Sequence, residues 1–465
     1  MPSPAQATGP SGAAPAGSSA PQGASAPGEG DKDDAASAPT ANGNGATAPP
    51  EEASAGGEAG RGPAILRREL PDWALAAITA LVTLPVLWMG YGTDLDVGAL
   101  KVTGALIRDF DYQPSRTPGV PVFEAIVAVL DPLGHVAINL ATALTTALAV
   151  IGIARLVRQF GRPNGDLIAL AFLASPIALV AASSTADFMY AIAFFVWAAW
   201  FHLRDRSIVA GLLFALAIGC RSSSFIIIGL FLLADFWTPT SRRRCLTTAA
   251  VVVPAAGLLY VPSWMAYDRT LGFLEHSEGW RGFKNNVGRF GYKNYYVAGP
   301  LLILAALSCV PAFYRSLRDW SHNHLARVGF LCLVGTELLF LQVPWKPAHL
   351  LPAVLMFVLW VAATDRNRRP FLFLLIAVIG INGIIAIRPL TPDRPDESQT
   401  ADFHPTLQVG PFLNDLRCRQ RYMDVEPAIL NGAWFCSLEP MRGPTIASQG
   451  EVPADVVPTD PAPPG

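Results

Sequence analysis

Charged residues are scarce in this chain of 465 residues, where Asp, Glu, Lys and Arg together make up 15%. An ordinary soluble domain carries about a quarter, so the scarcity argues against a soluble globular protein, as does the hydrophobic share of 51%. The net charge of −2 argues neither for nor against nucleic acid, but no basic face with interleaved aromatics of the kind usual for nucleic-acid binding occurs. We therefore expect no nucleic-acid partner.

Cysteine is also sparse, with six residues, and their spacing resembles no zinc site. Four of them lie in or beside apolar runs and are expected to be small buried hydrophobes, whereas Cys418 and Cys436 share a polar region. The chain lacks a glycine-rich phosphate loop followed by Lys-Ser/Thr, an HExxH motif and a nucleophile elbow. These absences argue against a cytoplasmic activity driven by nucleotides.

Apolar runs, in contrast, are abundant, and they follow one another from residue 71 to residue 388 between short basic clusters. Runs of this length predict an all-α, polytopic transmembrane helix bundle in the inner (plasma) membrane. Because most basic clusters fall on one side when the runs alternate, we expect a cytoplasmic N-terminus and an extracytoplasmic C-terminus. About eleven spans are expected, at 71–91, 135–157, 166–184, 187–203, 207–220, 225–237, 246–262, 296–311, 326–343, 349–363 and 371–387.

The two ends of the chain differ in composition from the spans. Residues 1–62 are rich in Ala, Pro, Gly and Ser, which predicts a disordered cytoplasmic tail, and no apolar run marks a signal peptide there. Residues 63–388 form the expected transmembrane domain, and residues 389–465 a small Pro-rich extracytoplasmic tail. That compartment permits a disulfide between Cys418 and Cys436, but two cysteines fix no geometry, so a reduced pair is the alternative.

The first outward loop carries two carboxylates, Asp94 and Asp96, at the start of a predicted helix that Thr93 can cap. Apolar residues at helical spacing predict that this helix lies on the membrane surface, and they are Leu95, Ala99, Val102, Leu106 and Phe110. Each carboxylate is interpreted either as a helix-start residue favoured by the dipole or as a general base at the bilayer edge. Because residues two apart do not share a helix face, we expect one base at most.

Four further residues on the outward side are candidates for the site. Arg116, in a stiff segment bounded by Pro and Gly, can bind a phosphate with two parallel hydrogen bonds or reach lipid head groups. Glu124, the single internal charge of the next apolar helix, predicts a polar cavity or a paired cation. Asp187 begins a helix and is interpreted first as its cap. Arg221, in a turn between short spans, predicts an anionic lipid partner or a structural ion pair.

The largest outward loop, residues 263–295, interleaves aromatic residues with cations. Sugars stack on aromatic faces and phosphates favour such cations, although an interfacial aromatic belt is the alternative. A later basic segment enters a span from the same side. The expected substrate-binding residues are therefore Arg116, Glu124, Asp187, Arg221, Lys284, Arg289, Lys346 and His349.

In their order along residues 70–388, these motifs resemble the GT-C superfamily, the polytopic membrane glycosyltransferases that use polyprenyl-phosphate sugars. The matching elements are Thr93-Asp94-Leu95-Asp96, residues 115–121, Ser175-Pro176 followed by Asp187, the turn at Arg221, and residues 346–352. The resemblance implies a mannosyltransferase-like bundle with a polyprenyl-phosphate donor and Asp94 as the catalytic base. Leu95 separates two acids that are commonly adjacent in the superfamily, so the choice between Asp94 and Asp96 stays open, as does the use of a divalent metal.

The function predicted by the resemblance is inverting transfer of a sugar to a hydroxyl of a glycan, lipid or protein acceptor at the outer leaflet. One alternative is a transporter or lipid flippase, although no clear inverted repeat occurs and the charges gather at one leaflet rather than at the midplane. A second alternative is an inactive scaffold with the same fold. The composition, rich in Ala, Pro and Gly, suggests a bacterium with a high-GC genome.

Overall fold

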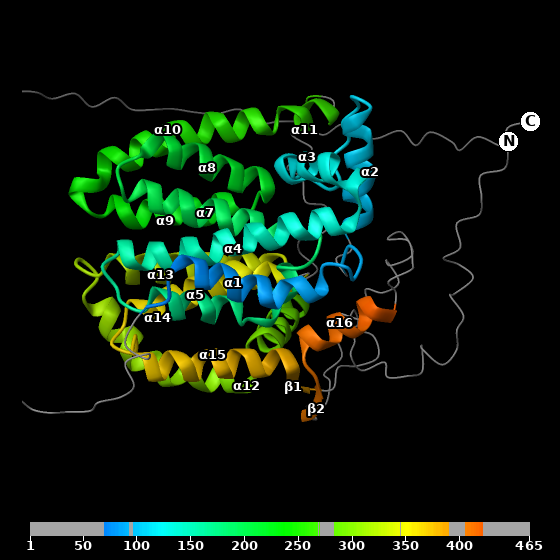
Figure 1. Ribbon diagram of the computed structural model, residues 1–465. Helices are drawn as coiled ribbons and strands as arrows, with labels where there is room; N and C mark the ends of the chain where they lie inside the picture. Colours follow the sequence, from blue (N-terminus) through cyan, green and yellow to red (C-terminus); the bar gives the residue numbers. More distant parts are fainter. Residues whose placement is uncertain are drawn as a thin grey trace, which may run out of the picture. The chain divides into compact units, whose positions relative to one another are not determined.

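The computed structural model describes residues 69–92, 96–267, 269, 283–344, 346–389 and 405–421 of the chain. Within these ranges the protein is built mainly from helices, as Figure 1 shows. Three helical stretches are long and apolar enough to cross a membrane, judged by length and composition, namely His135–Gln159, Asn286–Arg318 and His324–Gln342. Six shorter apolar helices accompany them, and this composition supports a membrane location.

The α-helices have the following bounds: α1 (Asp72–Thr83), α2 (Val97–Arg108), α3 (Pro121–Leu130), α4 (His135–Gln159), α5 (Gly165–Leu173), α6 (Pro176–Ala181), α7 (Phe188–His202), α8 (Ser207–Cys220), α9 (Ser224–Phe236), α10 (Arg242–Leu259), α11 (Val261–Ala266), α12 (Phe283–Arg318), α13 (His324–Gln342), α14 (Leu351–Ala362), α15 (Arg369–Ile384) and α16 (Pro411–Arg421). Short 3-10 helices are η2 (Leu84–Val86), η3 (Asp131–Leu133), η4 (Pro239–Ser241) and η6 (Pro347–Leu350).

Two strands add a small antiparallel sheet that the all-α prediction does not include. β1 (Ile385–Pro389) continues α15, and β2 (Pro405–Val409) leads into α16, with Ile385 opposite Val409 and Ile387 opposite Leu407. Helix α16 then packs on α15 and α6. Part of the predicted C-terminal tail is therefore folded onto the bundle.

Every predicted span overlaps a helix, but the bounds differ in several places. The span predicted at 166–184 is broken into α5 and α6, because Pro176 lacks the N–H that would continue the helix. The loop predicted at 263–295 is helical from Phe283, where α12 begins. Gly299 kinks α12 with a positive φ of 65°. The number of membrane crossings, about eleven, and the domain boundaries at residues 62 and 388 stay predictions.

Close packing of small residues joins neighbouring helices in the core. A methyl group added at Gly211 of α8 would lie 2.6 Å from Cβ of Val251 in α10, and one at Gly329 of α13 would lie 2.7 Å from Cβ of Trp360 in α14. Small residues allow such close approach of helices, which is the usual means of association in membranes. The four cysteines expected to be buried hydrophobes are buried, namely Cys220, Cys245, Cys309 and Cys332.

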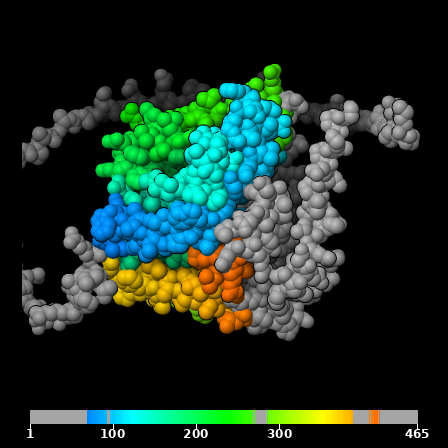
Figure 2. Space-filling model, turned by 45° about the vertical axis from the view of Figure 1, so that its right-hand side comes forward, coloured from blue at the N-terminus to red at the C-terminus, as the bar shows by residue number. Residues whose placement is uncertain are grey.

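The long helices run side by side, and α2 lies across one end of them (Figure 1). Helices α3, α11 and α16 lie at the same end, which we call the α2 end. Figure 2 brings this end forward and shows α2 in light blue and α16 in orange. A helix lying across the ends of transmembrane helices has the arrangement predicted for a membrane-surface helix.

The face of helix α2 that packs against the protein is not the apolar face predicted from the sequence. Val97, Leu100 and Gly104 are buried, and α2 packs on α3. Val102 and Phe110 of the predicted apolar face are exposed at 61% and 101%. The buried face thus contacts protein, and the predicted apolar face is available for lipid.

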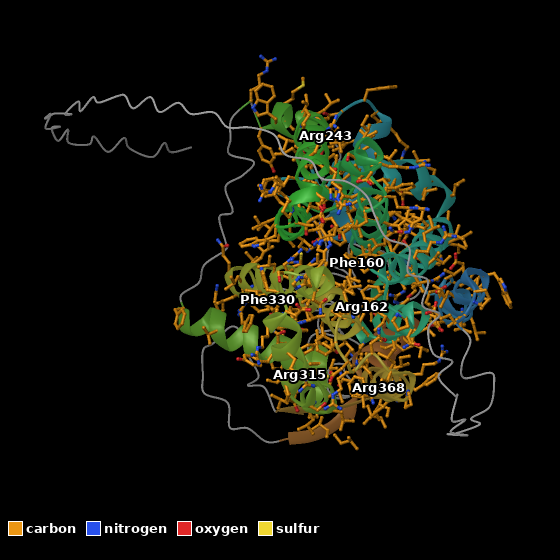
Figure 3. The ribbon with its side chains drawn as sticks, turned by 90° about the vertical axis from the view of Figure 1, so that its left-hand side faces the viewer. Phe160, Arg162, Arg243, Arg315, Phe330 and Arg368 are labelled. Atoms are coloured by element: carbon orange, nitrogen blue, oxygen red, sulfur yellow. The ribbon has the colours of Figure 1, made fainter. Side chains whose placement is uncertain are left out.

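Arginines gather at the opposite end of the long helices, which we call the arginine end. Figure 3 looks onto this end and labels four of them, Arg162, Arg243, Arg315 and Arg368. They lie at or just beyond the ends of α4 and α12, in the first turn of α10, and directly before α15. This asymmetry is the pattern on which the predicted orientation depends.

Candidate functional site

Asp96, at the start of α2, joins two cations from distant parts of the chain. Its Oδ2 contacts Nη1 of Arg116, and its Oδ1 lies 2.9 Å from Nζ of Lys346, just before η6. The Asp96 side chain makes no capping hydrogen bond to α2. Asp96 stands at the N-cap position of α2, where the helix-start interpretation places it, but its carboxylate contacts side chains from distant parts of the chain.

Asp187 also contacts Arg116, and it contacts a further cation, Arg221. Nη2 of Arg116 contacts its carboxylate, and Nη1 of Arg221 lies 3.2 and 3.1 Å from its two oxygens. The Arg221 guanidinium also lies over the ring of Phe188, 3.8 Å from its centroid. Asp187 makes no capping hydrogen bond, so its first interpretation as a cap is wrong, and Arg221 has the structural ion pair that was one of its two interpretations.

Glu124 fixes the backbone that carries Arg116. Its buried carboxylate accepts hydrogen bonds from the Tyr112 hydroxyl (2.7 Å), the Ser115 backbone N–H (2.8 Å) and the Ser115 hydroxyl (2.6 Å). Neither the polar cavity nor the paired cation expected for Glu124 matches these contacts. The fully buried Glu124 therefore holds the Arg116 segment in place, and its predicted part in substrate binding stays a prediction.

Residues in and just after α11 contact the segment that carries Arg116, and the sequence analysis did not predict these contacts. Ser263 lies 3.0 Å from the Tyr112 hydroxyl, and the Thr117 hydroxyl lies 2.9 Å from that of Tyr267. Burial, followed by the nearby Glu124 charge, raises the pKa of Tyr112 above its ordinary value. Tyr112 therefore remains a neutral donor to Glu124 through the physiological range.

His349 lies among the cations of the site. Its ring is 6.0 Å from that of Phe188 and 6.5 Å from that of Phe340, centroid to centroid. Four cations are close enough to act electrostatically on it, namely Arg116, Arg221, Lys293 and Lys346. Lys293 falls within the outward loop predicted at 263–295, but in the structure it belongs to α12.

Two of the remaining predicted residues belong to α12. Arg289 is half-buried in α12, and the side chain of Lys284 in the same helix lies outside the described part of the chain. Asp94 also lies outside the described residues, as does Cys436, so their predicted roles stay predictions.

A small apolar pocket adjoins Arg221 between α7, α9 and α14. Its volume is about 20 Å³, close to that of a single water. Besides Arg221 and Ser224 it is lined by Phe188, Ala191, Ile192, Phe195, Ile227, Pro352, Leu355 and Met356. Arg221 therefore both pairs with Asp187 and lines this apolar pocket.

Helix α16 supports the segment before Asp187, and no sequence motif indicated this role. The buried Arg419 donates hydrogen bonds to the backbone carbonyls of Ser183 (2.6 Å) and Val180 (3.3 Å), at the end of α6. Its Nε lies 2.7 Å from Asp415 on the same helix. The chain after β2 thus helps to hold the α6–α7 turn.

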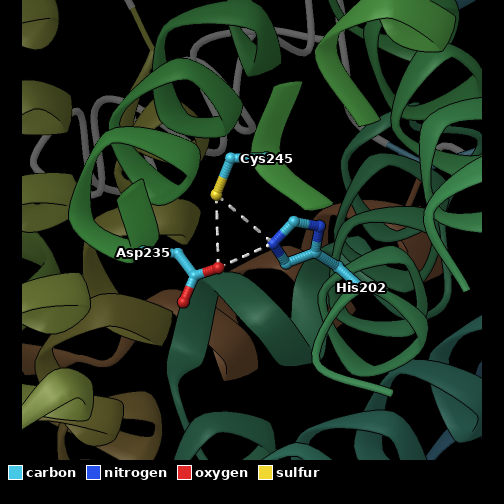
Figure 4. Close-up of side chains that lie close together, drawn as sticks. All are labelled: His202, Asp235 and Cys245. Atoms are coloured by element: carbon cyan, nitrogen blue, oxygen red, sulfur yellow. Dashed lines mark hydrogen bonds and ion pairs between the residues drawn. The ribbon is translucent and has the colours of Figure 1, made fainter. Parts of the chain in front are cut away.

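A separate buried cluster lies towards the arginine end, where α7, α9 and α10 meet (Figure 4). Oδ2 of Asp235 is 2.9 Å from Nε2 of His202 and 3.3 Å from Sγ of Cys245, a set that could hold a metal ion. However, Arg244 donates two hydrogen bonds of 2.8 Å to the same carboxylate, and the Thr248 hydroxyl lies 2.9 Å from His202 Nδ1. The positive charge of the Arg244 guanidinium would repel a bound cation. The cluster is therefore interpreted as a set of hydrogen bonds that joins α7, α9 and α10.

Two solved structures are similar to this chain. The crystal structure of ArnT from Cupriavidus metallidurans bound to undecaprenyl phosphate is 17% identical, with a TM-score of 0.47, and the match covers 62% of this chain and 59% of that one. The apo state of the same protein is 19% identical, with a TM-score of 0.44 and coverage of 62% and 58%. This chain thus matches less than two thirds of either neighbour's length. No protein-family model and no curated protein matches the chain.

Proposed function

We propose that this protein is a membrane glycosyltransferase that moves a sugar from a polyprenyl-phosphate donor to an acceptor hydroxyl, with inversion at the anomeric carbon. The observation that carries the proposal is the convergence of Arg116, Arg221 and Lys346 around two carboxylates at the α2 end, next to an apolar pocket. A polyprenyl phosphate carries an anionic group, for which these cations offer partners, while its apolar chain would lie in the bilayer.

The cations are the proposed binding groups for the lipid phosphate. Negative charge grows on that phosphate as its bond to the sugar breaks, and cations already fixed by Asp96 and Asp187 need little reorganisation to stabilise it. Arginine suits this task because its planar guanidinium can bind phosphate oxygens with two parallel hydrogen bonds. Four cations lie close enough to His349 to act on it electrostatically, and such a gathering of positive charge favours an anionic ligand.

Asp94 is the proposed general base. Both oxygens of Asp96 already contact cations, so Asp96 is suited to position Arg116 and Lys346. The carboxylate of Asp94 would accept the proton of the acceptor hydroxyl while that oxygen attacks the anomeric carbon. The bond from this carbon to the phosphate oxygen breaks, and the polyprenyl phosphate leaves with the electron pair. No covalent enzyme intermediate is needed.

The proposed orientation places the α2 end at the outer leaflet and the arginine end in the cytoplasm. The predominance of arginines at one end supports this assignment. The position of α2 across the other end also supports it, because the exposed Val102 and Phe110 could enter the lipid interface. Donor and acceptor would then meet at the membrane surface.

The proposal is tested by transfer from a panel of labelled polyprenyl-phosphate sugars to endogenous acceptors, in membranes that contain the wild type or a variant. Asp94→Asn should lower transfer by about 10²- to 10⁴-fold, the usual contribution of a general base. The matched control is Asp109→Asn, which removes an exposed carboxylate at the end of α2 and should leave transfer unchanged.

Other results of this experiment would indicate a different base or a different function. Normal transfer by Asp94→Asn together with a large loss in Asp96→Asn would reassign the base. No transfer from any donor, with folded and abundant wild type, would contradict the enzyme. Lipid flux that Asp94→Asn abolishes would then indicate a transporter, and no effect in either assay would indicate a scaffold.

A further inference from the structure

An open basic groove lies at the arginine end, on the surface formed by the first turns of α8 and α10. Its volume is about 490 Å³, within the range of about 300–1,000 Å³ that small-ligand sites occupy. Arg206, Arg243 and Arg244 line it together with hydroxyls of Ser207, Thr240 and Thr247. It is remote in the fold from the site at the α2 end, and the proposed function does not use it.

The charges of the groove favour an anion. Asp205 is its single carboxylate among the lining residues, and it lies 3.5 Å from Nη1 of Arg244. Arg244 is also held by Asp235 inside the bundle, so its position is fixed. Arg206 and Arg243 are exposed at the mouth. Two exposed arginines beside a third that is held by carboxylates suit the oxygens of a phosphate.

The surface that continues from the groove is apolar, which favours a lipid over a soluble phosphate. Ile208 and Leu212 on α8 are exposed at 63% and 50%, and Leu246 and Val253 on α10 at 62% and 61%. The members of each pair are four or seven residues apart, so each pair lies on one face of its helix. These faces begin at the groove and extend along the helices towards the α2 end.

We propose that this groove binds the phosphate of an anionic phospholipid whose acyl chains lie along α8 and α10. Basic pockets between transmembrane helices on the cytoplasmic side are the kind of site that such lipids occupy. Because Arg244 joins the groove to the buried Asp235, a bound lipid would also stabilise the junction of α8, α9 and α10.

The test uses the full chain in nanodiscs of phosphatidylcholine with and without phosphatidylglycerol. Bound phosphatidylglycerol is counted by native mass spectrometry after release, and the thermal midpoint is recorded in both lipids. The double variant Arg206→Gln/Arg243→Gln should bind phosphatidylglycerol roughly 30-fold more weakly, and Arg243→Gln alone roughly fivefold. Phosphatidylglycerol should raise the thermal midpoint of the wild type but not that of the double variant.

The matched control is Arg204→Gln/Arg242→Gln, which removes the same charge from the same end outside the groove. These two arginines instead lie over the rings of Trp200 and Phe236. An equal loss of lipid in the control would overturn the proposal in favour of general surface attraction, and so would unchanged binding by both double variants. Displacement of the lipid by inorganic phosphate at millimolar concentration would overturn it in favour of a soluble anion.

Discussion

The pairing of Asp187 with two arginines predicts a large loss of stability when its charge is removed. Asp187→Asn keeps the size of the side chain but removes the negative charge that faces Arg116 and Arg221. The side chains of Asp187 and Arg221 are 4% and 11% exposed, so breaking this buried pair should cost about 3–5 kcal/mol. Arg116 is 29% exposed and should contribute at most about 1 kcal/mol more.

The second variant of this test separates charge from shape. Asp187→Asn/Arg221→Gln removes both charges of the buried pair and should recover part of the loss, with a coupling energy of about 1–3 kcal/mol in a double-mutant cycle. Unfolding is followed by tryptophan fluorescence in mixed micelles as the share of denaturing detergent rises. The cycle needs all four proteins under the same conditions.

The control for this prediction is Asp365→Asn. Asp365 lies 2.7 Å from Arg315, but the two side chains are 53% and 60% exposed, so the loss should stay below about 1 kcal/mol. If Asp187→Asn loses no more than this control, the reasoning from burial is refuted, and the ion pair at the α2 end is as well solvated as a surface pair.

Three further predictions concern packing and protonation. The pKa of Tyr112 is raised in the folded state, so the neutral side chain stabilises the fold fully below the ordinary tyrosine pKa and less as pH rises above it. Tyr112→Phe should therefore lose less stability at alkaline pH than the wild type. Equal pH profiles of the two proteins would contradict this. Arg419→Gln should expose the chain after β2 to limited proteolysis, whereas Arg417→Gln, on the exposed side of α16, should not; equal cleavage would refute the role of Arg419. Gly211→Ala should cost about 1–3 kcal/mol by forcing α8 from α10, while Gly229→Ala, with open space at its Cβ, should cost nothing measurable in the same unfolding assay.

The sequence by itself determined the membrane class and the approximate position of most helices in the chain. Apolar length and flanking arginines are local properties, so the runs at 135–157 and 326–343 correspond closely to α4 and α13. It also identified most residues that converge at the α2 end, because a charge in an apolar chain is costly and therefore informative wherever it occurs. Local signals failed where a proline or glycine changed a helix, as at Pro176 and Gly299.

Only the tertiary structure decided which of these residues contact one another. Asp187 meets Arg116 across 71 positions and Arg221 across 34, and Arg419 reaches Ser183 across 236. Asp96 and Asp187 both stood at predicted helix starts, where capping is the ordinary expectation from sequence. Packing brought cations to both carboxylates, and a charge-assisted bond between side chains took the place of the cap. Partners this far apart are set by how the helices pack, which hydrophobic periodicity along a single chain does not encode.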